Sequence, residues 1–112
     1  MKSIIEQVDD FMSSNWNNAW LGDNILKVYV RKHNRYFDGS YLYVFDVANI
    51  GTIPKKHQGK GYFKALMVKI ESLGIPVFVE NIHNPALATM LQKNGYTILY
   101  HGEDIHAIKY PS

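Results

Sequence analysis

Two glycines, in the tetrapeptide Gln-Gly-Lys-Gly at positions 58–61, most constrain how this chain can fold. They separate a segment rich in β-branched and aromatic residues from one whose apolar residues recur at helical spacing. Glycine lets a backbone turn tightly and approach a ligand closely. A helix that follows adds free N–H groups and a positive dipole end, so the junction is suited to phosphate. A P-loop is excluded because no Gly-Lys-Ser or Gly-Lys-Thr ending is present, and a dinucleotide fold would need a third glycine and an earlier first strand.

Hydrophobic periodicity and turn residues predict the order helix, strand, strand, helix, strand, helix, strand, strand. Ser3 opens the first helix with a capping box, Gly74 ends the second, and Asn84 followed by proline begins the third. An Asp-Gly pair at 38–39 predicts a hairpin turn, and residues 15–24 are predicted to form an ordered loop. The strand–helix–strand step favours a parallel pair, which implies a mixed sheet with helices packed on it. The expected helices are 3–14, 63–73 and 84–95, and the expected strands are 26–31, 41–50, 77–79, 96–100 and 105–110.

Composition bounds the function classes. The 112 residues, 46% hydrophobic and 20% charged, predict one globular domain spanning 1–112. A net charge of +2 gives no sign of nucleic-acid binding. The absence of cysteine excludes disulfides, thiolate zinc sites and a cysteine nucleophile, and the five histidines lack metal-ligand spacing, so no metal is expected. No apolar stretch reaches the ~20 residues of a membrane span, and the N-terminus meets acidic residues too early for a secretory signal. We expect a cytoplasmic protein.

A second motif begins at Asn84 and ends in the Gly-Tyr pair at 95–96. Together with the glycine loop, it resembles the GNAT superfamily of N-acetyltransferases over residues 26–110. The resemblance implies an α+β (α/β) fold with a mixed, mostly antiparallel sheet. Gln58 and Gly61 match the signature of that family, whereas Phe63 stands where the family has Gly or Ala. Because Phe63 belongs to an apolar stripe, we expect its side chain to turn into the core and leave the backbone amides to phosphate.

The resemblance also implies a coenzyme A site and acetyl-CoA as the co-substrate. The pyrophosphate is expected on the amides after the glycine turn, and the pantetheine arm between strands that separate near residues 53 and 80. A backbone amide near residues 51–53 is expected to hold the thioester carbonyl. Lys93 has the alternative role of a cation at a helix C-terminus. The residues expected to bind the cofactor are Gly51, Thr52, Ile53, Gln58, Gly59, Lys60, Gly61, Tyr62, Phe63, Asn84, Leu87 and Lys93.

Catalytic groups are harder to place. Leu91 occupies the position where many members carry a tyrosine that protonates the departing thiolate. Asp46 is the nearest equivalent of the family's strand-borne glutamate base. A carboxylate on a mostly apolar strand face needs a reason to be there, and a structural hydrogen bond explains it as well as a base role. His101 is the other catalytic candidate, with surface or packing roles as its alternative.

Two function hypotheses follow. The first is an acetyl-CoA-dependent N-acetyltransferase whose acceptor is an amine of a protein, a peptide or a small molecule. The second is a non-catalytic module of the same fold that binds coenzyme A or a protein partner, as Phe63 and Leu91 suggest. The basic residues at 55–60 are either a solvated turn or an attraction for phosphates. The sequence does not decide whether the protein forms a homodimer. Aromatic residues such as Trp16 and Trp20 have three alternative roles: packing in the core, lining an acceptor groove or forming a surface for a protein partner.

Overall fold

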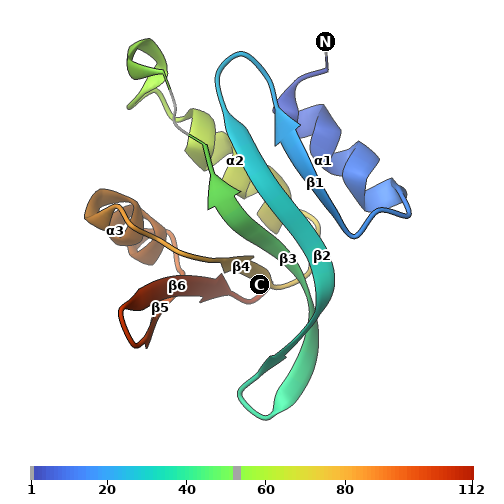
Figure 1. Cartoon of the computed structure of the whole chain (residues 1–112), viewed down its shortest axis with the longest axis vertical. Coiled ribbons are helices and arrows are strands. Elements are labelled where there is room, and N and C mark those ends of the chain that lie inside the picture. Colours follow the sequence, from blue (N-terminus) through green and yellow to red (C-terminus); the bar gives the residue numbers. More distant parts are fainter. Residues whose placement is uncertain (1, 52–53) are drawn as a thin grey trace.

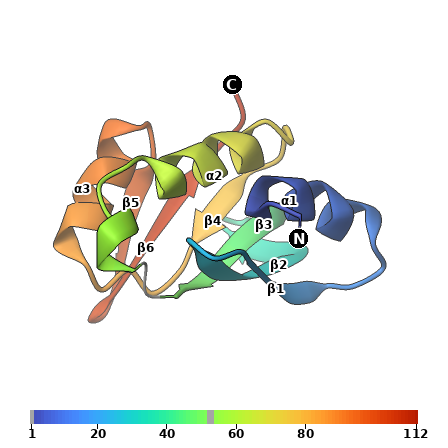
Figure 2. The ribbon, with the colours of Figure 1, turned by 90° about the horizontal axis from the view of Figure 1, so that it is seen from above.

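The computed structural model describes residues 2–51 and 54–112, and in that part of the chain three helices pack on one face of a six-stranded sheet (Figure 1, Figure 2). The strand order is β1-β2-β3-β4-β6-β5. β3 and β4 run parallel and the other neighbouring pairs run antiparallel, so the predicted mixed, mostly antiparallel sheet is confirmed. The elements are α1 (Ile4–Ser13), β1 (Asn18–Gly22), β2 (Lys27–Phe37), β3 (Ser40–Ile50), the 3₁₀ turn η1 (Lys55–His57), α2 (Tyr62–Glu71), β4 (Val77–Val79), α3 (Pro85–Lys93), β5 (Thr97–His101) and β6 (Asp104–Lys109).

The helix ends follow the sequence signals. The Ser3 side chain accepts a hydrogen bond from the Glu6 N–H at 3.2 Å, and the Asn84 side chain accepts one from the Ala86 N–H at 2.9 Å. Each bond satisfies one of the N–H groups that a helix start leaves without an intrahelical partner. The capping predictions at both sites are confirmed.

The prediction of a loop at residues 15–24 is wrong, because this segment contains β1. The strand pairs antiparallel with β2 from Asn18↔Arg31 to Gly22↔Lys27. Leu21 is its one buried side chain, so the strand shows no alternation that sequence reasoning could find. Backbone hydrogen bonds to β2 hold this segment as a strand, and its side-chain pattern does not predict that pairing. β2 is also longer than expected, since it continues to Phe37.

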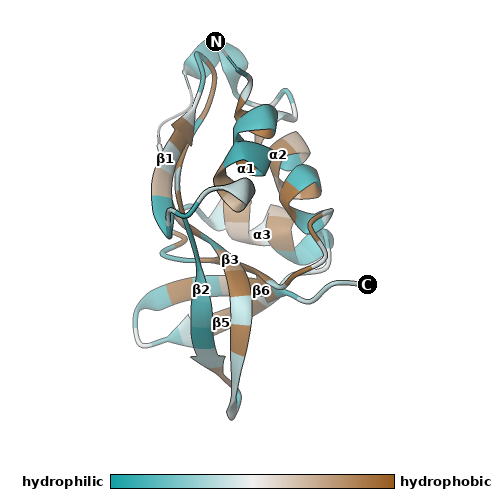
Figure 3. Ribbon diagram, turned by 90° about the vertical axis from the view of Figure 1, so that its right-hand side faces the viewer, coloured by the Kyte–Doolittle hydropathy of each residue, from teal (hydrophilic) through white to brown (hydrophobic). Residues whose placement is uncertain are grey.

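The two faces of the sheet differ in what covers them (Figure 3). On one face, side chains from all three helices form the main core with the inward residues of the strands, such as Phe45 and Val47. The opposite face, which we call the open face, carries a smaller apolar cluster of Val44, Phe78 and Ile108. No helix residue contributes to that smaller cluster in the described part of the chain. Asp46 lies on the open face, because it sits one residue from Phe45 and strand side chains alternate.

A β-bulge and a short parallel ladder shape the centre of the sheet. Val30 pairs with Val47 and Tyr29 pairs with Asn49, which leaves Ala48 as the extra residue of β3. The bulge places Asn49 on the open face with Asp46, so side chains do not alternate regularly beyond Asp46. β3 and β4 pair over three positions, ending at Val47↔Val79 and at a hydrogen bond from the Glu80 N–H to the Val47 carbonyl of 3.0 Å. Beyond that bond the two parallel strands separate.

Within residues 2–51 and 54–112, no helix combines the length and the apolar character that a membrane crossing requires.

Candidate functional site

The glycine turn leads directly into the N-terminus of α2. Gly59 and Gly61 have φ values of 73° and 80°, in the left-handed region that residues with a Cβ avoid. Gly61 is the N-cap of α2, and it makes no side-chain capping bond. A Cβ built on either glycine would meet no heavy atom within 4 Å, so the space beside the turn is open. The free N–H groups of the first helical turn are therefore available to an anionic ligand.

Phe63 does not obstruct this turn. Its side chain is 9% exposed and belongs to the main core together with Leu66 and Ile70 from the same helix. The expectation that Phe63 turns inward is confirmed. Its neighbours Tyr62 and Lys60 stay exposed at the surface of the turn.

A cluster of cationic side chains surrounds the turn. Lys55 and Lys56 are exposed on η1, and Lys60 and Lys64 are exposed on either side of the start of α2. The His57 ring packs edge-on against the Tyr62 ring, with centroids 5.7 Å apart. Because the fold brings these charges beside uncapped amides, the local field at the turn favours an anion.

The α3 N-terminus lies at the same edge of the sheet. α2 follows β3 and α3 follows β4, so both helices begin at the carboxyl ends of the parallel pair, where the strands separate. In open sheets that edge is where ligands bind. Asn84 and the half-buried Leu87 are both brought there, although the Asn84 side chain is already engaged in capping.

Two predicted residues do not join the glycine turn or Asp46, although His101, at the carboxyl end of β5, lies at the same edge of the sheet. Lys93 is the last residue of the nine-residue α3, which places it about 13 Å along the helix from Asn84. His101 is exposed at the end of β5, three strand positions from β3 and hence about 14 Å across the sheet. The structure does not bring either residue next to Asp46 or the glycine turn.

The expectation that the Gly51 amide binds the thioester carbonyl is wrong. The Gly51 N–H donates to the Lys27 carbonyl at 2.7 Å, so it is not available to a ligand. Thr52 and Ile53, predicted to bind the cofactor, lie outside the described residues. The bulge at Ala48, which interrupts the ladder between β2 and β3, is the remaining backbone feature at the point of separation.

Asp46 is fully buried, at 0% exposure, inside a charged cluster on the open face. Its Oδ2 lies 3.5 Å from Arg31 Nε, 3.4 Å from His33 Nε2 and 3.8 Å from Arg35 Nη1. Glu80 forms ion pairs with both arginines, and its distance to Arg35 is 2.8 Å. The guanidinium of Arg35 stacks 3.9 Å from the centre of the Phe78 ring. Asp46 Oδ1 and Arg31 Nε have no hydrogen-bond partner among the described residues.

The two carboxylates of this cluster titrate in opposite directions. Burial, followed by the negative charge and hydrogen bond of Glu80, raises the pKa of Asp46 from 3.8 to about 6, although His33 and Arg31 partly oppose the rise. Burial also acts to raise the pKa of Glu80, but its bonds to Arg35 and Arg31 outweigh burial and hold that pKa below 4.5. Glu80 is therefore the fixed anion, and Asp46 is the carboxyl that changes charge near neutral pH.

Sequence reasoning missed four members of this cluster: Arg31, His33, Arg35 and Glu80. A signal for three of them exists, because cationic or ionisable residues at alternate positions of a strand share one face. The predicted strand ended at residue 31, which hid the pattern. Glu80 carried no signal, since only the three-dimensional pairing of β4 with β3 brings it beside Arg31 and Arg35.

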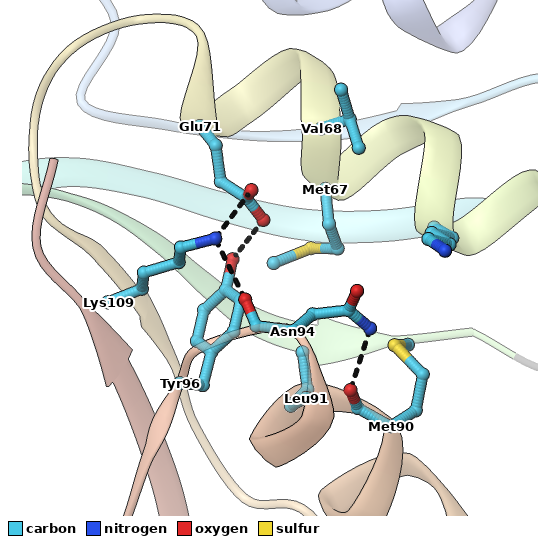
Figure 4. Close-up of a pocket in the computed structure, with 9 residues that line it drawn as sticks. Met67, Val68, Glu71, Met90, Leu91, Asn94, Tyr96 and Lys109 are labelled. Carbon is cyan, nitrogen blue, oxygen red and sulfur yellow. Dashed lines mark hydrogen bonds and ion pairs between the residues drawn. The ribbon is translucent and has the colours of Figure 1, made fainter. Parts of the chain in front are cut away.

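A small pocket of about 40 Å³ lies between the C-terminal halves of α2 and α3 (Figure 4). Tyr96 donates to Glu71 at 2.8 Å, and Lys109 binds Glu71 at 3.1 Å and the Asn94 carbonyl at 2.8 Å. Burial, followed by the bond to Glu71, raises the pKa of Tyr96 well above its usual range. Tyr96 is 3% exposed and belongs to the main core. The pocket is at the opposite helix ends from the glycine turn, and its volume admits a few water molecules at most.

Comparisons with known proteins support the fold. No family model matches the sequence, and no curated protein matches it. The AtaT mutant toxin, solved with the C-terminus of the antitoxin AtaR and acetyl-CoA, superimposes with a TM-score of 0.58 at 17% identity. That match covers 76% of this chain, which spans 57% of the length of AtaT. The Bacillus subtilis N-acetyltransferase YlbP, solved with coenzyme A, gives 0.61 at 15% identity over 96% of this chain and 78% of YlbP. The chain therefore has the GNAT fold, as the sequence motifs predict.

Proposed function

We propose that this chain is an acetyl-CoA-dependent N-acetyltransferase. The observation that carries the proposal is the uncapped, glycine-led N-terminus of α2 at the edge where the parallel strands β3 and β4 separate. The proteins of similar fold AtaT and YlbP were solved with acetyl-CoA and coenzyme A, which supports the same cofactor here. The acceptor is an amine on a protein, a peptide or a small molecule.

In this proposal the pyrophosphate binds the amides of residues 59–63, with Lys60 as a neighbouring cation. The pantetheine arm lies between the separated ends of β3 and β4, beside Asn84 at the start of α3. The bulge at Ala48 supplies the backbone N–H for the thioester carbonyl, in place of the Gly51 amide that is bonded to Lys27. A donor fixed there would stabilise the oxyanion of the tetrahedral intermediate.

The chemistry is a balanced transfer. A protonated amine loses one proton, and its nitrogen attacks the thioester carbonyl carbon. The nitrogen then loses a second proton as the C–S bond breaks to give an amide and the coenzyme A thiolate. The thiolate takes up one of these two protons, and the other is released for each acetyl group. Asp46 is the proposed acceptor of the amine proton through a bridging water, because a base with a pKa of about 6 matches neutral conditions. Its Oδ1 has no hydrogen-bond partner among the described residues, so this oxygen is the one left to accept a proton.

The second candidate is a non-catalytic module of the same fold that binds coenzyme A or a protein. Leu91, at the position of the family's tyrosine acid, is 0% exposed, so no general acid stands there. The AtaT neighbour was solved with an antitoxin segment, which makes a protein partner for this chain a reasonable alternative. The thiolate leaves readily without an acid because thiols have pKa values near ~8.5, so the first candidate remains preferred.

Titration calorimetry with acetyl-CoA and then coenzyme A tests the cofactor site. We expect micromolar binding, and we expect Gly61→Trp to weaken it by about tenfold or more, because the indole would fill the space beside the α2 amides. Gly39→Trp is the matched control, since Gly39 has φ +82° and equally open surroundings in the distant hairpin turn. No binding by the wild type at millimolar cofactor would refute the proposal, and equal binding by both variants would refute the loop assignment.

A thiol-release assay with acetyl-CoA and a panel of polyamines and lysine-containing or free N-terminal peptides separates the two candidates. Release of coenzyme A that depends on an added amine supports the enzyme. Tight binding without release for any amine favours the non-catalytic module.

A further inference from the structure

His33 is held beside Asp46 in one defined orientation. Its Nδ1 lies 3.2 Å from the Asn34 carbonyl oxygen, and its Nε2 lies 3.4 Å from Asp46 Oδ2. A carbonyl oxygen only accepts, so Nδ1 carries the hydrogen of that contact. In the neutral ring Nε2 is then the bare acceptor, and it faces the carboxyl. A proton at the Nε2–Oδ2 contact therefore belongs either to Asp46 or to the imidazole.

Among the described residues, the other groups around Asp46 are less suited to carrying its proton to solvent. Arg31 and Arg35 stay protonated throughout the physiological range. Glu80 shares a hydrogen bond with Asp46, but Arg35 and Arg31 lower the pKa of Glu80, so this carboxyl stays an anion and does not keep the proton. His106, on β6 beyond Phe78, accepts the Asn81 N–H through Nδ1 at 3.2 Å and makes no recorded contact with Asp46. Imidazole is the side chain that gains and loses protons near neutral pH.

The His33 side chain contacts both the buried Asp46 and the solvent. Asp46 has no exposed surface, whereas the side chain of His33 is 34% exposed. A carboxyl with no solvent contact needs a neighbour that returns its proton to water after each turnover. The acetyl transfer proposed above releases one proton for each acetyl group, so such an exit is required at every cycle.

We propose that His33 is the group through which Asp46 exchanges its proton with solvent. Only the role of this exchange in turnover rests on the proposed acetyltransferase function; the exchange itself is a property of the charged cluster. A proton moves from Asp46 Oδ2 to His33 Nε2, and the resulting imidazolium releases a proton to water. No other atom is gained or lost. Asp46 remains the base, and His33 restores it.

Carbon-13 NMR of the Asp46 carboxyl tests the exchange without any substrate. We expect a single averaged signal that titrates with pH in the wild type. In His33→Asn the signal should broaden at its midpoint because exchange with water slows, and the midpoint should move to higher pH because His33 lowers the pKa of Asp46. His83→Asn, which changes an exposed histidine, is the matched control and should leave both features unchanged. An Asp46 signal that is sharp and unmoved in His33→Asn would overturn the proposal.

Turnover supplies the second readout. With any amine that the panel identifies, His33→Asn should lower kcat by about tenfold in dilute buffer, and added imidazole should restore it. Its affinity for acetyl-CoA by calorimetry should match that of the wild type. A kcat equal to the wild type at every buffer concentration would overturn the exit role even if the enzyme is real. Absence of acetyl-CoA binding would refute the proposed function instead, and the NMR result would still decide the exchange.

Discussion

The Asp46→Asn substitution should make this protein increasingly more stable than the wild type as the pH rises. The Asp46 carboxyl is fully buried, and its pKa in the folded protein is raised from 3.8 to about 6. An acid whose pKa is raised by folding opposes folding once it ionises. The penalty is absent below about pH 3.8, where both the folded and the unfolded states are protonated, and it is complete above about pH 6.

The size of the effect follows from the same two values. A rise from 3.8 to about 6 corresponds to about 3 kcal/mol at high pH, since one pKa unit is ~1.36 kcal/mol. About half of this, about 1.4 kcal/mol, develops between about pH 5 and pH 8. Glu80 stays ionised throughout that window because its pKa lies below 4.5. The asparagine variant keeps the shape of the side chain but has no charge to bury, so it should escape the loss.

Urea unfolding at several pH values, followed by tryptophan fluorescence, measures the difference. The free energy of unfolding of Asp46→Asn minus that of the wild type should grow by about 1.4 kcal/mol from about pH 5 to pH 8. His33 contacts Asp46 and carries an ionisable imidazole, so the comparison is repeated with His33→Gln present in both proteins. The trend should persist there and increase, because His33 lowers the pKa of Asp46. If the difference in free energy of unfolding between Asp46→Asn and its parent does not change with pH in either background, burial of this charge carries no penalty.

Two substitutions test how the scaffold holds the site. Lys32 is 7% exposed, and its ammonium donates to the carbonyls of Phe11 and Ser14 at 2.6 Å each, closing the C-terminus of α1. Lys32→Met should therefore lower the free energy of unfolding by about 3 kcal/mol, whereas the exposed Lys27→Met should change it by less than about 1 kcal/mol; equal effects in urea unfolding would contradict the capping role. Tyr96→Phe removes the bond to Glu71 while the ion pair of Glu71 with Lys109 remains, so the loss should be about 1 kcal/mol by the same assay. A loss above about 3 kcal/mol would mean that the buried hydroxyl supports more than this bond.

Local sequence chemistry was sufficient for several elements. Ser3 and Asn84 cap helices because their short polar side chains can reach a free N–H, which needs no information from distant parts of the chain. The glycines at 59 and 61 mark a left-handed turn for an equally local reason. Phe63 could be assigned to the core from its place in the apolar stripe of a helix.

Other features depended on strand pairing and could not be read from the chain. β1 exists because β2 offers it a backbone ladder, and its own side chains are mostly exposed. Because of the bulge at Ala48, Asn49 follows Asp46 on the open face, whereas a regular alternation would predict Ala48 there. The separation of β3 from β4 and the occupied amide of Gly51 are likewise consequences of long-range hydrogen bonds.

The sequence by itself determined the three helices and the strands other than β1, the glycine turn at the start of α2 and the presence of a carboxylate on an apolar strand. Each of these depends on residues that are neighbours along the chain or repeat at the period of a helix or strand. Only the tertiary structure decided the surroundings of Asp46. Arg31, His33 and Arg35 come from the antiparallel neighbour of β3, and Glu80 comes from its parallel neighbour. The pKa of a buried carboxyl is set by its burial and by these charges across strands, so its chemistry is fixed by register and not by the order of residues.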